Sequence, residues 1–321
     1  MAVAAVIIVL VDDVIVAMST VSRREVSRAW WTREDDDEGD PRNAPLAEHG
    51  FSALIRLRIG DERHTLLFDA GARGRVMLHN AGFFDLDWRE VEAVAFSHGH
   101  FDHTGGAPAA LERIGRRVPV IAHEHMFSEY ARRDRQGRLK PLSRAQIVSR
   151  QELADRGAEI ILNREPLSLF DGALAVLGEI PRQTEFEPEP HPDLLRKEKG
   201  EWVASPWVWD DRSLAMIVRS KGLVVVSGCA HAGIVNTLLH AQAIMGAERV
   251  YAVIGGFHLA GKRFELRIPA TVRALAEMEP GLVIPLHCTG WRGTQALVEA
   301  LPGAAVPGSV LLRARLGDWE D

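Results

Sequence analysis

The stretch SHGHFDHTGG, residues 97–106, places three histidines and one aspartate within six positions. It directly follows VEAVAF (91–96), an apolar run of strand length. A buried strand is therefore predicted to end at the cluster. Side chains two residues apart on an extended chain point to the same side, so His98 and His100 can reach one cation.

The rest of the cluster supports a metal site. Asp102 and His103 add an oxygen and a nitrogen donor at the next turn. Gly99, Gly105 and Gly106 let the backbone bend closely around an ion. A single histidine is more often a surface or core residue than a ligand. Burying this many imidazoles without a metal, however, would be costly.

Three more histidines follow apolar runs: His231 in VVVSGCAHAG, His258 in AVIGGFHLAG and His287 in VIPLHCTG. Strands of one sheet end at a common edge, so we expect these side chains to join the first cluster. Histidine and carboxylate ligands with open positions suit zinc, manganese or iron.

Composition points to a globular protein with a small-molecule substrate. The 321 residues are 46% hydrophobic and 26% charged, with a formal net charge of −6. We expect no nucleic-acid partner, because such binding normally needs a basic face. The apolar N-terminus has no basic flank and is interrupted by Asp12 and Asp13, so it predicts a buried strand rather than a membrane span. The two cysteines, Cys229 and Cys288, imply no disulfide framework and fit a cytoplasmic protein.

The order of the predicted elements favours an α/β fold. Hairpins are expected at 51–71 and 213–228, and strand–helix alternation occurs in both halves of the chain. We therefore expect a four-layer αββα sandwich in one domain spanning 1–321. The expected helices lie at about 73–81, 108–117, 124–134, 144–157, 233–246, 266–278 and from 294 onward.

Two segments are expected to be irregular. An acidic loop is predicted at about 30–47 and a lid-like insertion at about 181–211. In the insertion, Trp207 and Trp209 either stack on a flat heterocycle or anchor the segment to the body. The basic run at 131–144 either binds a phosphate-bearing substrate or is a solvated helix-to-loop face.

The HxHxDH pattern at a strand end resembles the signature of the metallo-β-lactamase-fold superfamily, and the order of later histidines extends the resemblance over about 45–315. AEHGFSALI, GEIPRQTEFE, GCAHAGIVNT, GGFHL and PLHCTG resemble a branch that contains dihydropterin-linked synthases and metal-dependent hydrolases. The resemblance implies a metallo-β-lactamase-like sandwich that binds one or two divalent ions, zinc first, with manganese, iron or magnesium as alternatives.

The resemblance also implies a ligand set. It assigns two residues to a first metal, two to a second and one as the last histidine ligand: His98, His100, Asp102, His103 and His287. Asp102 would also orient the nucleophile.

This sequence departs from the family pattern at two places. Glu179 stands where most members have a histidine. Cys229 and His231 stand where most have a bridging aspartate, and we favour His231 as the ligand with Cys229 as a packed neighbour. His258 is a candidate proton donor, ligand or support for the site. His49, like Glu179 and Cys229, is a candidate substrate contact or neighbour of the ligands.

The expected function is a metal-dependent hydrolase that uses activated water on a small ester, lactone or phosphoester. One alternative is a transferase that joins a dihydropterin diphosphate to a ribofuranosylaminobenzene phosphate. Another is a non-catalytic metal-binding protein of the same fold. The substrate is expected to carry a phosphate or a heterocycle, and the oligomeric state is left open.

Overall fold

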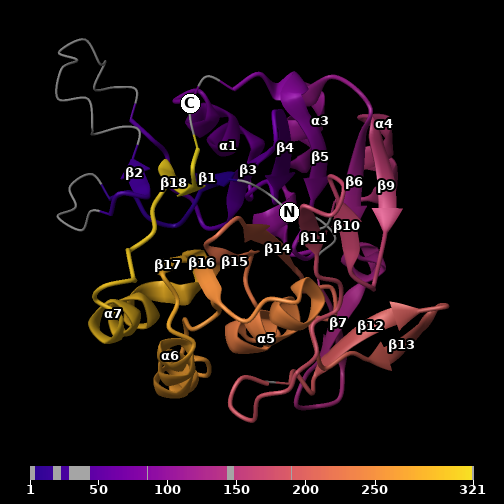
Figure 1. Cartoon of the computed structure of the whole chain (residues 1–321). Helices are drawn as coiled ribbons and strands as arrows, with labels where there is room; N and C mark the ends of the chain where they lie inside the picture. Colours follow the sequence, from indigo (N-terminus) through magenta and orange to yellow (C-terminus); the bar gives the residue numbers. More distant parts are fainter. Residues whose placement is uncertain are drawn as a thin grey trace.

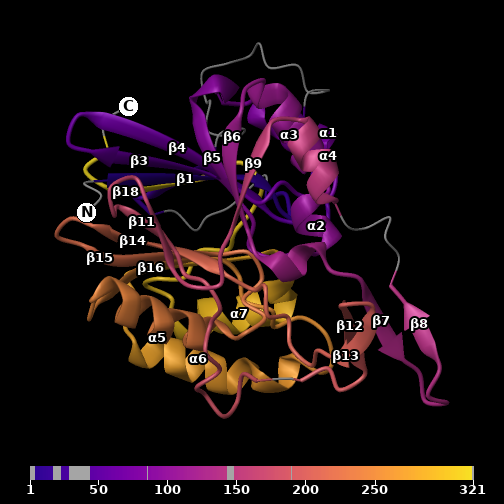
Figure 2. The same cartoon turned by 90° about the vertical axis from the view of Figure 1, so that its right-hand side faces the viewer.

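The computed structural model describes residues 4–16, 23–28, 44–84, 86–142, 148–188 and 190–319. Two large β-sheets pack face to face, and helices cover the outer face of each (Figures 1 and 2). This arrangement confirms the expected four-layer αββα sandwich. Most of the acidic stretch predicted at 30–47 lies outside the described residues.

The first sheet has eight strands in the order β2-β18-β1-β3-β4-β5-β6-β9. Its central strand β1 is buried along its whole length, as its unbroken apolar sequence predicts. Antiparallel pairing of β3 with β4 confirms the first hairpin. The strands are β1 (Ala4–Val11), β2 (Val26–Arg28), β3 (Ser52–Ile59), β4 (Glu62–Phe68), β5 (Val91–Ala95), β6 (Val118–Ala122), β9 (Ala158–Leu162) and β18 (Leu312–Gly317).

The second sheet has six strands in the order β10-β11-β14-β15-β16-β17. Antiparallel pairing of β14 with β15 confirms the second hairpin, and β15, β16 and β17 run parallel. The strands are β10 (Leu167–Leu169), β11 (Leu174–Val176), β14 (Ser213–Val218), β15 (Gly222–Ser227), β16 (Val250–Gly256) and β17 (Leu282–Leu286).

Helices close the two outer layers (Figure 2). The first sheet is covered by α1 (Gly74–Ala81), α3 (Ala107–Ile114) and α4 (Arg150–Asp155), and the second by α5 (Ile234–Met245), α6 (Ile268–Glu277) and α7 (Gly290–Ala300). Shorter helical turns are α2 (Phe101–Thr104), η1 (Trp88–Glu90), η2 (Glu124–Phe127), η4 (Glu265–Arg267) and η5 (His287–Thr289). No helix among the described residues is long and apolar enough to cross a membrane.

The main core lies between the sheets. Phe51 and Phe68 from the first sheet meet in an edge-to-face contact with ring centroids 6.2 Å apart, and neither is exposed to solvent. Met216 and Ile254 belong to the same buried cluster from the second sheet. Burial of both inner faces fixes how the strand ends of the two sheets are placed relative to each other.

A third sheet of four strands, in the order β13-β12-β7-β8, stands apart from the two layers (Figure 2). Its strands are β7 (Tyr130–Arg133), β8 (Leu139–Pro141), β12 (Leu194–Glu198) and β13 (Glu201–Ala204). The helix predicted at 124–134 is therefore wrong. The segment forms a short helical turn and then β7, because Leu194–Arg196 supplies backbone partners from a distant part of the chain. The insertion at 181–211 likewise contains a hairpin, β12–β13, and is not wholly irregular.

Two boundaries also differ from the predictions, and one strand was not predicted. The last helix begins at Gly290 rather than near 294. Within the described residues the helix predicted at 144–157 is α4 (Arg150–Asp155), since Val148 and Ser149 are not helical, and 143–147 lie outside the described part. Strand β18 was not predicted, although it pairs with β1 and completes the first sheet.

Candidate metal centre

The predicted site residues meet where strands of both large sheets end. The loop after β5 supplies His98 and His100, and α2 supplies Asp102 and His103. The strand ends of the second sheet supply Cys229 and His231 after β15, His258 after β16 and His287 after β17. We expected one sheet to bring these residues together, but the histidines face one another from two sheets.

The His98 ring is fully buried and held in one tautomer. Ser97 Oγ lies 2.6 Å from Asp69 Oδ2, a carboxylate that can only accept, so the hydroxyl donates there. The same Oγ lies 2.9 Å from His98 Nδ1 and must accept from it. His98 Nε2 is therefore unprotonated, and it lies 2.8 Å from His100 Nδ1 and 3.2 Å from His231 Nε2. Burial and the neighbouring imidazoles hold the pKa of His98 well below its usual range, so the ring is neutral.

Asp69 orients a second ring in the same way. Its Oδ2 accepts from His103 Nδ1 at 2.7 Å, and its Oδ1 accepts from the backbone N–H of Ser97 at 2.7 Å. The side chains of Asp69 and His103 are both fully buried. His103 Nε2 is consequently left bare, and it lies 3.2 Å from Cys229 Sγ.

The N-terminal strand orients the last histidine. His287 Nδ1 lies 2.8 Å from Asp13 Oδ1, and its backbone N–H donates to Asp12 Oδ1 at 2.7 Å. His287 Nε2 therefore points at Asp102 Oδ2, 3.4 Å away. Burial opposes a charge on this ring, but the nearby Cys288, Asp102 and Asp13 raise the pKa of His287 well above its usual range.

The acceptors converge in a way that fits a divalent cation. Asp102 Oδ2 lies within 3.4 Å of His287 Nε2 and 3.2 Å of His49 Nε2, and 3.8 Å from His103 Nε2. Burial would raise the pKa of Asp102, but hydrogen bonding and charge from His287 and His103 lower it, so the carboxylate is ionised. The proton on His287 offsets the charge of Asp102, but the unprotonated His98 Nε2 faces the nitrogens of His100 and His231 and requires a proton or a cation between them. His49 reaches this group although its side chain is 62% exposed.

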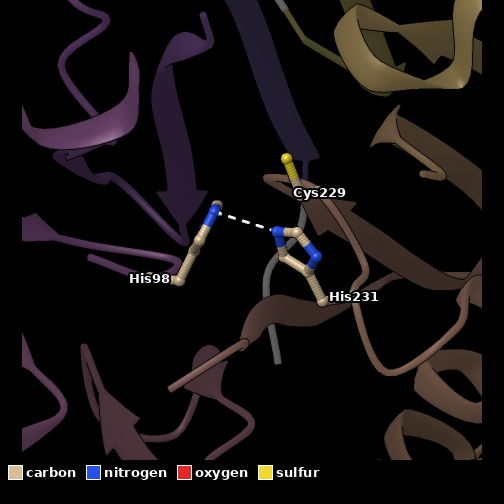
Figure 3. A group of neighbouring side chains, drawn as sticks. All are labelled: His98, Cys229 and His231. Atoms are coloured by element: carbon tan, nitrogen blue, oxygen red, sulfur yellow. Dashed lines mark hydrogen bonds between the residues drawn. The ribbon is translucent and has the colours of Figure 1, made fainter. Parts of the chain in front are cut away.

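Cys229 belongs to three of the groups of side chains that could share an ion, and Figure 3 shows it beside His98 and His231. Its Sγ is close enough to share an ion with His98 and His231, and also with His103 and His287. Burial raises the pKa of the Cys229 thiol. The structure thus places both Cys229 and His231, the two candidates for the place of the bridging aspartate, beside His98.

Glu179 is turned away from the cluster. Its Oε1 lies 3.0 Å from His123 Nε2 and 3.8 Å from Arg164 Nη1. Because His123 Nδ1 accepts from the backbone N–H of His125, Nε2 carries the proton and donates to Glu179. Among the described residues, Glu179 joins no group that could hold an ion.

His258 lies beside the ligand cluster and faces the cavity. Its ring centroid is 4.1 Å from that of His231, and its buried Nδ1 has no hydrogen-bond partner among the described residues. His258 and His287 have φ values of 47° and 45°, a left-handed conformation that a residue with a side chain rarely adopts. Such conformations concentrate at functional sites. Cys288 donates through Sγ to the carbonyl of Cys229 at 3.5 Å.

The histidines His100, His231 and His258 open into a cavity of about 340 Å³. The third, accessory sheet contributes Tyr130, Arg132 and Leu194 to the cavity wall, and the insertion also contributes Trp207. Phe101 of α2 and Phe264, just before η4, line it as well. Trp207 and Trp209 both lie against the Arg182 guanidinium, at 4.8 and 5.0 Å from the ring centroids. Arg182 belongs to the same insertion, so these contacts join its beginning to its end, and Trp207 also lines the cavity.

The carboxylates that orient His103 and His287 were not predicted from the sequence. Asp69 follows β4 in FDAG, and Asp13 follows β1 in VDD. Both aspartates follow the end of a buried strand, as the candidate histidines do. Asp210, which accepts from the backbone N–H of Gly99 at 2.7 Å, was also missed.

Comparisons with known proteins identify the family. A family model described as the metallo-beta-lactamase superfamily matches residues 47–238. The 7,8-dihydropterin-6-methyl-4-(beta-D-ribofuranosyl)-aminobenzene-5'-phosphate synthase of Methanocaldococcus jannaschii is 32% identical over 260 residues, which cover 80% of this chain and 86% of the synthase. An uncharacterized protein of the same organism is 28% identical, over 79% of this chain and 89% of that protein.

A solved structure described as a metal-dependent hydrolase of the beta-lactamase superfamily is 24% identical, with a TM-score of 0.70. The match covers 98% of this chain and 100% of that one, and it shows the shared fold. From the family match, the 32% identical relative and the fold, we conclude that this chain belongs to the metallo-β-lactamase superfamily.

Proposed function

We propose that the chain is a metal-dependent enzyme that hydrolyses a small ester, lactone or phosphoester. The observation that carries this proposal is the convergence of unprotonated nitrogens, one carboxylate and one thiol beside a cavity of about 340 Å³. When bound, one or two divalent cations would supply Lewis-acid chemistry and lower the pKa of a water molecule toward neutrality. Zinc is the first candidate, because imidazole, thiolate and carboxylate are its usual ligands.

In this proposal two groups of side chains hold the cations. His98, His100 and His231 form one group. Asp102, His103 and His287 form the other. Cys229 lies between the two groups and would be shared as a thiolate.

Other residues of the chain would handle protons and the substrate. Asp102 would orient the nucleophile through the carboxylate oxygen that is not committed to binding. His258 faces the cavity and would pass a proton to the leaving oxygen. His49 would support Asp102 from the exposed side. Glu179 would act only through His123, since it does not reach the ligand group.

Transfer rather than hydrolysis is the second candidate, and two observations favour it. The synthase relative is 32% identical and its match spans 86% of that protein. The cavity is lined largely by aromatic and aliphatic side chains, which suit a flat ring better than a small polar ester. In this variant the same residues would hold a diphosphate leaving group and an organic nucleophile would replace water.

Purified protein loaded with zinc, manganese or iron tests these proposals. It should be assayed with p-nitrophenyl phosphodiesters, with lactones, and with a dihydropterin diphosphate plus an arylamine acceptor. Hydrolysis of either of the first two substrate classes, lost in Asp102→Asn, supports the first proposal. Turnover only with the last pair would reject hydrolysis in favour of transfer. Glu62→Gln, whose side chain is 78% exposed and lies outside the cavity lining, is a control that should leave all rates unchanged.

A further inference from the structure

Asp210 is a carboxylate in the wall of the cavity that neither the ligand group nor the proposed mechanism uses. It is only 4% exposed and lines the cavity with His100, His231 and His258. Among the described residues, it belongs to no group close enough to share an ion.

The backbone on the C-terminal side of Asp210 is fixed in place. Asp211 Oδ2 accepts from the backbone N–H of Ala232 at 2.8 Å. The backbone N–H of Arg212 donates to the carbonyl of Ser97 at 2.9 Å, and its guanidinium is fully buried. Asp210 is therefore held on a rigid part of the insertion, as a binding group must be.

One oxygen of Asp210 is committed and the other is available. Oδ2 accepts from the backbone N–H of Gly99 at 2.7 Å. Oδ1 accepts no hydrogen bond from the described part of the chain. A carboxylate oxygen accepts hydrogen bonds, so a ligand in the cavity that presents a donor can satisfy Oδ1 in place of water.

The surrounding wall suits a flat ring. Phe101, Trp207 and Phe264 line the same cavity, and the Trp207 indole is held by its contact with Arg182. Aromatic side chains stack on any flat ring of suitable size. A buried carboxylate, by contrast, favours rings that carry hydrogen-bond donors over rings that lack them.

We propose that Asp210 determines substrate specificity by accepting hydrogen bonds from the N–H groups of a flat nitrogen-containing ring. This inference rests on the proposed function, because it takes the cavity beside the metal ligands as the substrate site. It goes further by naming Asp210 as the residue that recognises the ring and the N–H edge as the part of the ring that it contacts.

A pair of isosteric probes tests the inference. 2,4-Diaminopyrimidine carries N–H donors, and 2,4-dimethylpyrimidine has nearly the same shape without them. Binding is measured by ligand-observed NMR with zinc-loaded and with zinc-free protein. We expect the wild-type protein to bind the diamino ring at least tenfold more tightly in both forms. Equal binding of the two rings would overturn the proposal without any variant.

Asp210→Asn provides the second arm. Asparagine keeps an oxygen for the Gly99 N–H and turns an amide donor toward the cavity, so the preference for the diamino ring should disappear. Asp61→Asn changes an exposed carboxylate in the turn between β3 and β4, outside the cavity lining, and should leave the preference intact. A preserved preference in Asp210→Asn, or loss of its bound zinc, would overturn the proposal. Absence of turnover with intact ring discrimination would reject only the proposed function, since the zinc-free measurement does not depend on chemistry.

Discussion

Replacing Asp69 by asparagine should weaken metal binding although Asp69 is not predicted to be a ligand. The wild-type carboxylate accepts from Ser97 Oγ at 2.6 Å and from His103 Nδ1 at 2.7 Å through the same oxygen. In Asp69→Asn an NH₂ group at that place would donate instead. Ser97 Oγ would then accept from Asn and donate to His98 Nδ1, and His103 Nδ1 would have to accept. Both rings would carry their proton on Nε2, the atom that must bind the metal.

The size of the effect follows from these contacts. Loss of a partner that orients a ligating histidine typically costs about 10- to 100-fold in metal affinity, equivalent to about 1.4–2.8 kcal/mol. Two rings are affected here, so we expect the upper end of that range. Loss of a buried hydrogen bond to a charged acceptor should also lower the free energy of unfolding by about 1.5–3 kcal/mol.

Zinc affinity is measured by competition with a chromophoric chelator, and stability by urea denaturation of the zinc-free protein. Asp61→Asn, a change of the same chemistry at an exposed position in the turn between β3 and β4, is the matched control and should alter neither quantity. Asp69→Asn protein that is folded and binds zinc as tightly as wild type would refute the tautomer argument.

Three further changes test the surroundings of the site. In Gly228→Ala the new Cβ would lie 2.1 Å from Ser97 Oγ. We therefore expect the free energy of unfolding to fall by about 1–3 kcal/mol and zinc to bind more weakly. In the control Gly303→Ala the new Cβ meets no atom within 4 Å, so the same titration should give the wild-type zinc affinity. Arg212→Met removes the guanidinium donors to the carbonyl of Phe96 at 2.6 Å and to Asn163 Oδ1 at 2.7 Å. Urea denaturation should show that the free energy of unfolding falls by about 3 kcal/mol. An unchanged denaturation midpoint would contradict a stabilising role for these hydrogen bonds. Removal of the metal with a chelator should lower the melting temperature, because free zinc at 100 times its dissociation constant stabilises the native state by about 2.7 kcal/mol. The same melting temperature with and without the chelator would argue against a metal site that forms only on folding.

The sequence was sufficient to predict the layers of the fold and the histidines that meet at the strand ends, because these signals are local. Apolar runs of strand length appear directly in the sequence, as in Ala4–Val11, and the HxHxDH spacing follows from the geometry of a strand end. The sequence could not show that the histidines come from two sheets. That depends on how the inner faces pack, as at Phe51 and Phe68.

The accessory sheet could not be predicted for a related reason. EHMFSEYARRD has the helix-forming residues and spacing of an amphipathic helix, yet Tyr130–Arg133 is extended, because Leu194–Arg196 pairs with it across more than sixty intervening residues. Pairing partners this far apart leave no local periodic signal. The carboxylates Asp13 and Asp69 were missed because an aspartate after a strand is common, and only its contact with His287 or His103 gives it significance.

The hydrogen bonds between Asp12, Asp13 and His287 have a practical consequence for any shortened form of the protein. The family match begins at residue 47, downstream of these two aspartates. A fragment cut at that boundary would retain every candidate metal ligand and lose β1, the central strand between β18 and β3. It would also lose the partners of the His287 ring and backbone, which lie 274 and 275 residues away in sequence. The smallest unit able to hold its last histidine in place is thus longer than the region by which the family is recognised.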